Sequence, residues 1–185
     1  MRLFYHLDRA RYIKPGDILT LEEGPGDIFL GVWTPFVDAA FVEHLRGLAR
    51  SGLSRHGTLY LIAMIAEQCP LSNYMTEMYW EHVRWKEYPD KPSRFRSVFA
   101  WDNIEQTIKF ANDAGSGVLF EIESDQGYHR ADMNLLHMDF DPAVQLNRAR
   151  RYWESKPAET SLAYKPQWEY LVIPPARVIR DVPLR

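Results

Sequence analysis

The sequence predicts an α+β protein with a single domain over residues 1–185. Strand-like alternation near both ends of the chain, helical spacing of apolar residues over about 35–88, and the lack of a linker or internal repeat all support this. A chain of this length buries about 70% of the surface that its unfolded form exposes. It therefore needs neither a metal nor disulfides to fold.

The first half of the chain predicts two short strands and then a helical block. Residues Arg2–Leu7 alternate as a strand, and Ile18–Leu21 form a second extended run. Thr34 and Pro35 indicate a helix start, because a hydroxyl caps the first turn and proline suits the first helical position. Two further helices are expected, over Leu59–Cys69 and Asn73–Tyr88.

The second half returns to strands. Arg94–Trp101 alternates as a strand, and a helix capped by Asp102 or Asn103 follows and ends at Gly115. A polar stretch from about 125 to 167 contains only one predicted helix. That helix and the three remaining strands are expected at Ala143–Tyr152, Val118–Ser124, Trp168–Ile173 and Arg177–Val182.

Composition excludes several classes of protein. With 22 Lys+Arg against 25 Asp+Glu, the net charge of -3 gives no general attraction for nucleic acid or acidic membranes. A single cysteine, Cys69, excludes a disulfide framework and a cysteine-based zinc site. No signal peptide or membrane-length apolar run is visible, so we expect a cytoplasmic protein or a delivered effector. The aromatic content of 14% fits either a large core or a site that stacks planar ligands.

The most informative side chain is Glu169. It is the only charged residue in Trp168–Ile173, a strand with two apolar faces, and such strands are usually buried on both sides. A carboxylate is costly there unless it is paired or functional. Two interpretations stay open: Glu169 acts at a site, or it reaches water or pairs with an arginine such as Arg177.

His6, Ser97 and Phe99 are weaker candidates. His6 shares a face of the first strand with Phe4, and a lone strand histidine is more often structural than catalytic. Ser97 and Phe99 share a face of the strand over Arg94–Trp101 and, taken alone, indicate core packing.

Three polar groups fit ordinary structural roles. Histidines and aspartates crowd one loop at spacings that match no metal motif, namely His129, Asp132, His137, Asp139 and Asp141. Glu77, Glu81 and Arg84 have the spacing of an ion-pair ladder on a helix. The basic run Arg148–Arg151 fits a solvated helix face, with a phosphate contact as the alternative.

Three segments, in this order along the chain, resemble bacterial ADP-ribosyltransferases. They are Phe4–Arg9 with the turn that follows it, Ser97–Glu105, and Trp168–Val172. The order is similar to that of rifampin ADP-ribosyltransferases and of DNA-modifying ADP-ribosyltransferase toxins. The stretch from Glu81 to Phe95 resembles an uncharacterised bacterial domain family, known only as a domain of unknown function, to which we assign the chain as a suspected member.

The resemblance implies a split β-sheet core with a helical insertion at about 35–88, and NAD as the substrate. By position, it implies that His6 contacts the NAD ribose, that Phe99 stacks on nicotinamide, and that Glu169 holds a ribose hydroxyl. Two departures stand out. Leu7 replaces a usual glycine, which puts the backbone clasp on nicotinamide in doubt, and Phe99 replaces a common tyrosine.

Four further residues enter through the same resemblance. The rifampin enzymes place their acidic residue earlier in the chain, which nominates Asp132 as a rival to Glu169. Some transferases use an arginine and a serine to bind the cofactor, and Arg9 and Ser97 stand at matching places. Trp101, on the same strand as Phe99, is a further candidate for stacking.

Three functions follow as hypotheses. The first is NAD-dependent transfer of ADP-ribose to a protein, nucleic-acid or small-molecule acceptor, in which a carboxylate stabilises the developing oxocarbenium charge. The second is a non-catalytic module of the same fold that binds a nucleotide or a protein, which Leu7 and Phe99 favour. The third is a metal hydrolase built on His129 and His137.

Overall fold

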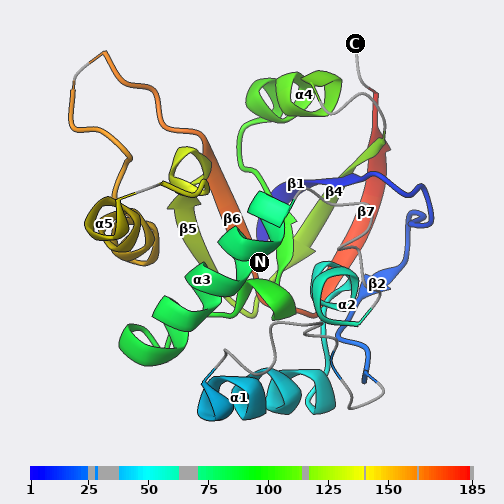
Figure 1. The fold of residues 1–185 in the computed structure, drawn as a ribbon. Helices are drawn as coiled ribbons and strands as arrows, with labels where there is room; N and C mark the ends of the chain where they lie inside the picture. The colour runs from blue at the N-terminus through cyan, green and yellow to red at the C-terminus, as the bar shows by residue number, and fades with distance from the viewer. Residues whose placement is uncertain are drawn as a thin grey trace.

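Two antiparallel sheets form the centre of the fold (Figure 1). The computed structural model describes residues 1–24, 28, 38–62, 71–113, 117–139, 141–161 and 163–183. The four-stranded sheet has the order β1-β4-β7-β2, with bounds Arg2–Asp8, Val118–Ser124, Ala176–Val182 and Ile18–Leu19. The three-stranded sheet has the order β3-β6-β5, with bounds Val98–Ala100, Trp168–Val172 and Tyr128–Asp132.

The two sheets meet where β1 passes the end of β3. Tyr5 and Trp101 exchange backbone hydrogen bonds of 2.7 and 2.9 Å at this point. An apolar core lies between the sheets and includes Phe4, Phe120, Tyr170 and Val178. The mixture of helices with antiparallel sheets confirms the α+β prediction.

Helices surround the sheets on several sides. Three of them lie between β2 and β3 in the chain, within the predicted helical block: α1 (Ala39–Arg50), α2 (Arg55–Leu61) and α3 (Leu71–Glu87). The described residues also contain the helices α4 (Ile104–Asp113) and α5 (Pro142–Trp153) and the 3-10 turns η3 (Arg94–Arg96) and η4 (Met133–Leu135). Within the described part of the chain, none of the helices is long and apolar enough to cross a membrane.

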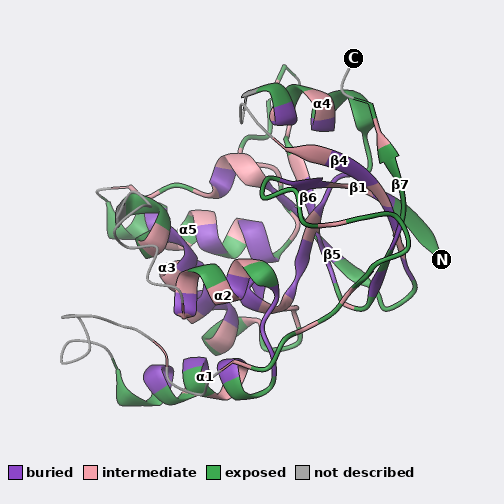
Figure 2. Ribbon diagram, turned by 90° about the vertical axis from the view of Figure 1, so that its right-hand side faces the viewer, coloured by how far each residue is buried: buried purple, intermediate pink, exposed green. Residues whose placement is uncertain are grey.

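The helices α3 and α5 pack on the sheet through their buried sides (Figure 2). Trp80 of α3 and Trp153 of α5 are both fully buried, and the indole Nε1 of Trp153 donates to the Trp80 carbonyl at 3.0 Å. Leu171 of β6 lies in the same cluster. This layer places α3, α5 and β6 side by side.

Some predicted boundaries were wrong. The strand expected over Arg94–Trp101 begins only at Val98, because the Ser93 hydroxyl accepts from the Phe95 backbone N–H at 3.2 Å and starts η3 instead. The helix α2 begins at Arg55, earlier than expected, and much of the predicted Leu59–Cys69 helix lies outside the described residues. Thr34 and Pro35 also lie outside them, and α1 is capped by Asp38.

The strand β5 was missed. Its sequence, Tyr128–Asp132, is mostly polar and gives no apolar alternation, yet His129, Ala131 and Asp132 are buried in it. Pairing with β6 along its whole length makes it a strand. A polar strand of this kind is determined by its neighbours rather than by its own pattern.

The position of η3 depends on a close approach to α2 at Gly57. A Cβ atom added to Gly57 would lie 2.1 Å from the Phe95 carbonyl oxygen, so we expect Gly57→Ala to cost about 3 kcal/mol through overpacking. Gly47 of α1 has no atom within 4 Å of such a Cβ. The control Gly47→Ala is expected to stabilise the protein by about 0.5–1 kcal/mol. Urea unfolding measures the free energy of unfolding of both variants. Equal changes in the two variants would contradict the close approach of α2 to η3.

Candidate functional site

Arg94 stands at the centre of a buried polar cluster. It is 4% exposed and begins η3, immediately before β3. Its Nε and Nη2 atoms donate to the two carboxylate oxygens of Glu77 on α3, each at 2.8 Å. Its Nη1 atom donates to Oε1 of Glu169 on β6 at 2.5 Å. One guanidinium therefore joins α3 to the three-stranded sheet.

Glu169 is 2% exposed, so the expectation of a buried carboxylate on β6 is confirmed. Besides Arg94, its Oε1 accepts from the Tyr152 hydroxyl of α5 at 2.5 Å. Arg94 also donates to the Tyr152 hydroxyl oxygen. The alternative prediction, that Glu169 pairs with Arg177, is wrong. The Nε atom of Arg177 lies 3.9 Å from Oε1 of Glu123 instead.

Aromatic rings cover the guanidinium. The Cζ atom of Arg94 lies 4.7 Å from the ring centroid of Phe99, and the His56 ring of α2 lies 4.5 Å from that centroid. The Nε2 atom of His56 lies 3.2 Å from Glu77 Oε2. Because Phe99 pairs with Leu171 across the sheet, its side chain shares a face with Glu169.

His6 lies at the edge of the same cluster. Its Nδ1 atom lies 2.7 Å from the backbone carbonyl oxygen of Phe99, which joins β1 to β3 beside the sheet junction. Burial lowers the pKa of His6, partly opposed by this hydrogen bond and by Asp8. The structure thus gathers His6, Phe99 and Glu169 on three neighbouring strands, with Phe99 between the other two.

The other predicted cofactor residues lie around this group rather than in it. Ser97 is 1% exposed and its hydroxyl donates to the Ser93 carbonyl at 2.8 Å. Trp101 is buried with its ring 4.6 Å from that of Phe110. Arg9 is exposed, and its Cζ atom lies 5.4 Å from the ring centroid of Phe110.

Asp132 is fully buried and its carboxylate is saturated by protein donors. It accepts from the backbone N–H groups of Asn134, Ala158 and Gln167 and from the Tyr164 hydroxyl, at 2.7–3.1 Å. The carboxylate ties the segment after α5 to the end of β5. This arrangement accounts for a buried aspartate by structure alone.

We therefore expect Asp132→Asn to lower the free energy of unfolding by about 3 kcal/mol, because an amide nitrogen cannot accept from these donors. Thermal unfolding would then occur roughly 6–12 °C lower for a chain of this size. Asp139→Asn is the matched control, since Asp139 is partly exposed and pairs with Arg148 at the surface. Equal, small shifts for both variants would refute the structural role.

Three members of the cluster, Glu77, Arg94 and Tyr152, keep their ionisation states at neutral pH. Burial alone would raise the pKa of Glu77. The positive charges of Arg94 and His56 lower the pKa by more than burial raises it, so the carboxyl stays ionised far into acid. Burial opposes the charge of Arg94, but Glu169 and Glu77 raise its pKa well above the ordinary value. Burial raises the pKa of Tyr152, which keeps the hydroxyl a donor.

A second buried network supports the first. On α3, Glu81 is fully buried and accepts from Arg84, at 2.8–3.1 Å, and from the Ser93 hydroxyl at 2.9 Å. The Nε2 atom of His44 on α1 lies 2.9 Å from the same carboxylate.

The sequence predicted that Glu77, Glu81 and Arg84 form an ion-pair ladder on the helix. It predicted neither the burial of these side chains nor the pairing of Glu77 with Arg94. The available signal was that Glu81 falls within the apolar stripe of its helix.

The histidines of the loop do not converge on a metal site. His129 is buried with its Nε2 atom 3.1 Å from the Tyr152 carbonyl oxygen, and His137 is exposed. Across the residues that the structure describes, three or more His, Cys, Asp or Glu side chains are nowhere grouped to hold a metal ion.

Burial lowers the pKa of His129 from 6.5 to about 4, with smaller contributions from Lys91 and Arg94. As the pH falls, His129 of the unfolded chain is protonated near pH 6.5, before His129 of the folded protein. The stability that neutral His129 contributes is therefore fully present above pH 6.5 and is lost as the pH falls towards 4. We expect His129 to account for about 2 kcal/mol of the stability lost between pH 7 and pH 5. Measured by urea unfolding, the free energy of unfolding of His129→Gln should fall between pH 7 and pH 5 by about 2 kcal/mol less than that of the unmodified protein. An equal fall in both proteins would contradict the role of His129.

Comparison with known proteins agrees with one part of the sequence resemblance. No curated protein matches the chain. The family described as "Protein of unknown function (DUF2441)" matches residues 4–183. This range includes every residue of the cluster, from His6 to Glu169. The suspected membership in a domain family of unknown function is therefore confirmed, and the chain belongs to the DUF2441 family.

Proposed function

We propose that the chain binds NAD beside His6 and Phe99 and transfers its ADP-ribose part to an acceptor, with release of nicotinamide. The observation that carries the proposal is the gathering of His6, Phe99 and Glu169 on β1, β3 and β6, where two sheets meet. These are the residues to which the resemblance to ADP-ribosyltransferases attaches roles. The split between two antiparallel sheets and the helices before β3 are what that resemblance leads one to expect.

The partly exposed residues of the cluster suit the binding step. His6, His56 and Phe99 are each partly exposed, whereas Glu169 and Arg94 lie behind them. A nicotinamide ring can stack on an aromatic face such as that of Phe99. The Nδ1–H of neutral His6 donates to the Phe99 carbonyl, so its Nε2 atom can accept a hydrogen bond from a ribose hydroxyl. Binding therefore begins at His6 and Phe99.

The reacting step requires Glu169 to exchange partners. Arg94 holds Glu77 through Nε and Nη2 and touches Glu169 only through Nη1. A ribose hydroxyl can thus replace Nη1 at Glu169 while the pair of Arg94 with Glu77 persists. The bond from the ribose to nicotinamide breaks and its electron pair leaves with nicotinamide. The carboxylate stabilises the oxocarbenium charge, and the acceptor then adds to the same carbon and loses a proton.

One observation favours a second function, a non-catalytic module that binds a nucleotide. Glu169 is 2% exposed, and its Oε1 already accepts from Arg94 and Tyr152. If these contacts persist in the complex, the carboxylate never meets the ribose, and a bound NAD stays intact.

Calorimetry with NAD, followed by an assay for free nicotinamide in the presence of a cell lysate, separates the two functions. Transfer predicts saturable binding, release of nicotinamide, and radioactivity from adenine-labelled NAD in a lysate component. The module predicts binding without release. The absence of binding at millimolar NAD would contradict the transfer of ADP-ribose and leave only a module that binds something other than NAD.

A further inference from the structure

The basic run on α5 points in two directions. Arg150 turns towards α3, where its Nε and Nη2 atoms donate to Glu87 at 2.7 and 2.9 Å. Arg148 and Arg151 are three residues apart and therefore share a different face of the helix. This face lines a groove between α5, η4 and the residues Ala158, Glu159 and Tyr164. Arg148 pairs with Asp139 at 3.0 Å, whereas Arg151 forms no ion pair with any described residue and is the arginine available to a ligand.

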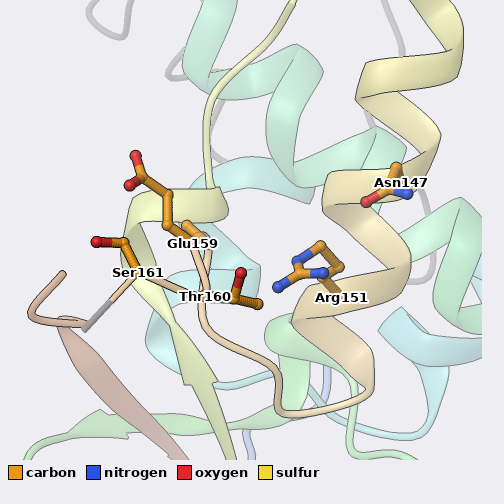
Figure 3. Close-up of a pocket in the computed structure, with 6 residues that line it drawn as sticks. Asn147, Arg151, Glu159, Thr160 and Ser161 are labelled. Atoms are coloured by element: carbon orange, nitrogen blue, oxygen red, sulfur yellow. The ribbon is translucent and has the colours of Figure 1, made fainter. Parts of the chain in front are cut away.

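The groove has a volume of about 560 Å³, within the range of small-molecule sites. One part is apolar and is formed by Leu135, Ala143 and Val144. The other part is polar and is lined by Asn147, Arg151 and Glu159. These three residues also line an adjoining hollow, together with Thr160 and Ser161 (Figure 3). A ligand that fills it therefore needs an apolar body with one polar end.

The polar part presents hydrogen-bond donors. Arg151 donates from Nε and Nη2 to the Pro157 carbonyl at 3.1 and 2.6 Å, which fixes the guanidinium and leaves Nη1 without a partner among the described residues. Asn147 forms no hydrogen bond with any residue in the described ranges, so its amide is available. In Figure 3 the guanidinium of Arg151 points towards Thr160, whereas the carboxylate of Glu159 points away from it.

The far wall of the groove is held in place. The buried carboxylate of Asp132 accepts from the Ala158 backbone N–H at 2.8 Å and from the Tyr164 hydroxyl at 2.7 Å. Both residues line the groove. The donors on α5 therefore face a wall that is fixed independently of any ligand, as a preformed site requires.

We propose that this groove binds a small organic anion, with its carboxylate or phosphate group at Arg151 and Asn147 and its apolar body against Leu135 and Val144. A guanidinium forms strong charge-assisted hydrogen bonds with either anionic group. The groove is separate from Glu169, because the partners of that carboxylate, Arg94 and Tyr152, do not line it. This proposal does not depend on NAD binding.

The test is titration of the protein with phenyl phosphate, benzoate, inorganic phosphate and benzylamine, followed by backbone amide NMR. Saturable binding of phenyl phosphate or benzoate, with shifts at residues of α5 and 158–164, is expected, and the tighter of the two identifies the anionic group. Inorganic phosphate should bind more weakly because it lacks the apolar body. Benzylamine binding as tightly as the anions, or no saturable binding of either organic anion, would overturn the proposal.

Variants on α5 give the matched comparison. Arg151→Gln and Asn147→Ala should each weaken binding, the first by about tenfold or more, since a charged hydrogen bond is lost. Arg150→Gln removes a charge from the same helix but not from the groove, and should leave the affinity unchanged. Asn147→Ala keeps the proposal testable if Arg151→Gln disturbs the fold, because the Asn147 side chain forms no hydrogen bond with any described residue. Equal losses in Arg150→Gln and Arg151→Gln would refute the site.

Discussion

Replacement of Arg94 by methionine is expected to destabilise the protein by about 3–5 kcal/mol, because it leaves two buried carboxylates without their counter-charge. Glu77 and Glu169 are 6% and 2% exposed, and both depend on the Arg94 guanidinium. Their negative charges would repel each other and lose the strongest donors that reach them. Urea unfolding monitored by tryptophan fluorescence measures the effect.

Two controls separate this effect from ordinary loss of a surface charge. Arg180→Met breaks an exposed pair with Glu121 at 3.0 Å and should have little effect on stability, because water and salt screen surface ion pairs. In the triple variant Arg94→Met, Glu77→Gln and Glu169→Gln, neutral amides replace both orphaned charges, and much of the stability should return. A loss in Arg94→Met no larger than in Arg180→Met would show that the cluster is not a buried ion-pair centre.

Glu169→Gln is expected to abolish NAD cleavage, by at least about a hundredfold, in a protein that remains folded. The amide oxygen of glutamine still accepts from Arg94 and Tyr152, and the remaining charges of Arg94 and Glu77 balance each other. The variant therefore removes a negative charge at the ribose with little change in packing. Nicotinamide release, normalised to folded protein by circular dichroism, measures it.

Asp132→Asn is the comparison that distinguishes the two acidic candidates. Because Asp132 serves four protein donors, its replacement should lower stability but leave the rate per folded molecule nearly unchanged below the unfolding transition. Full activity in Glu169→Gln together with an inactive but folded Asp132→Asn would transfer the role to Asp132.

Periodicity predicted much of the fold. The strand β4 agrees in both bounds with its prediction, and β1, β6 and α3 agree within two residues, because each has an apolar face that the core buries. The start of α4 was predicted from capping, and the Asn103 side chain does accept from the Gln106 N–H at 3.0 Å. Local signals suffice for elements of this kind.

The partners of the buried charges could not be predicted in the same way. Glu169 was identified because a carboxylate breaks an apolar strand, but Arg94 lies 75 residues away and no local pattern connects the two. The same limit applies to β5, whose strand conformation depends on pairing with β6. Long-range pairing decides both cases, and a single sequence does not display it.

Histidine-labelled NMR with NAD tests the central claim most directly, because the six histidines lie in different parts of the fold. His6 and His56 flank Phe99 at the proposed site, whereas His44 and His82 contact Phe41 in the helical layer and His137 lines the groove beside α5. The account predicts that NAD shifts the His6 and His56 resonances together, along one saturation curve, and leaves those of His44 and His82 in place. Shifts confined to His137, or unchanged His6 and His56 signals at saturating NAD, would contradict it.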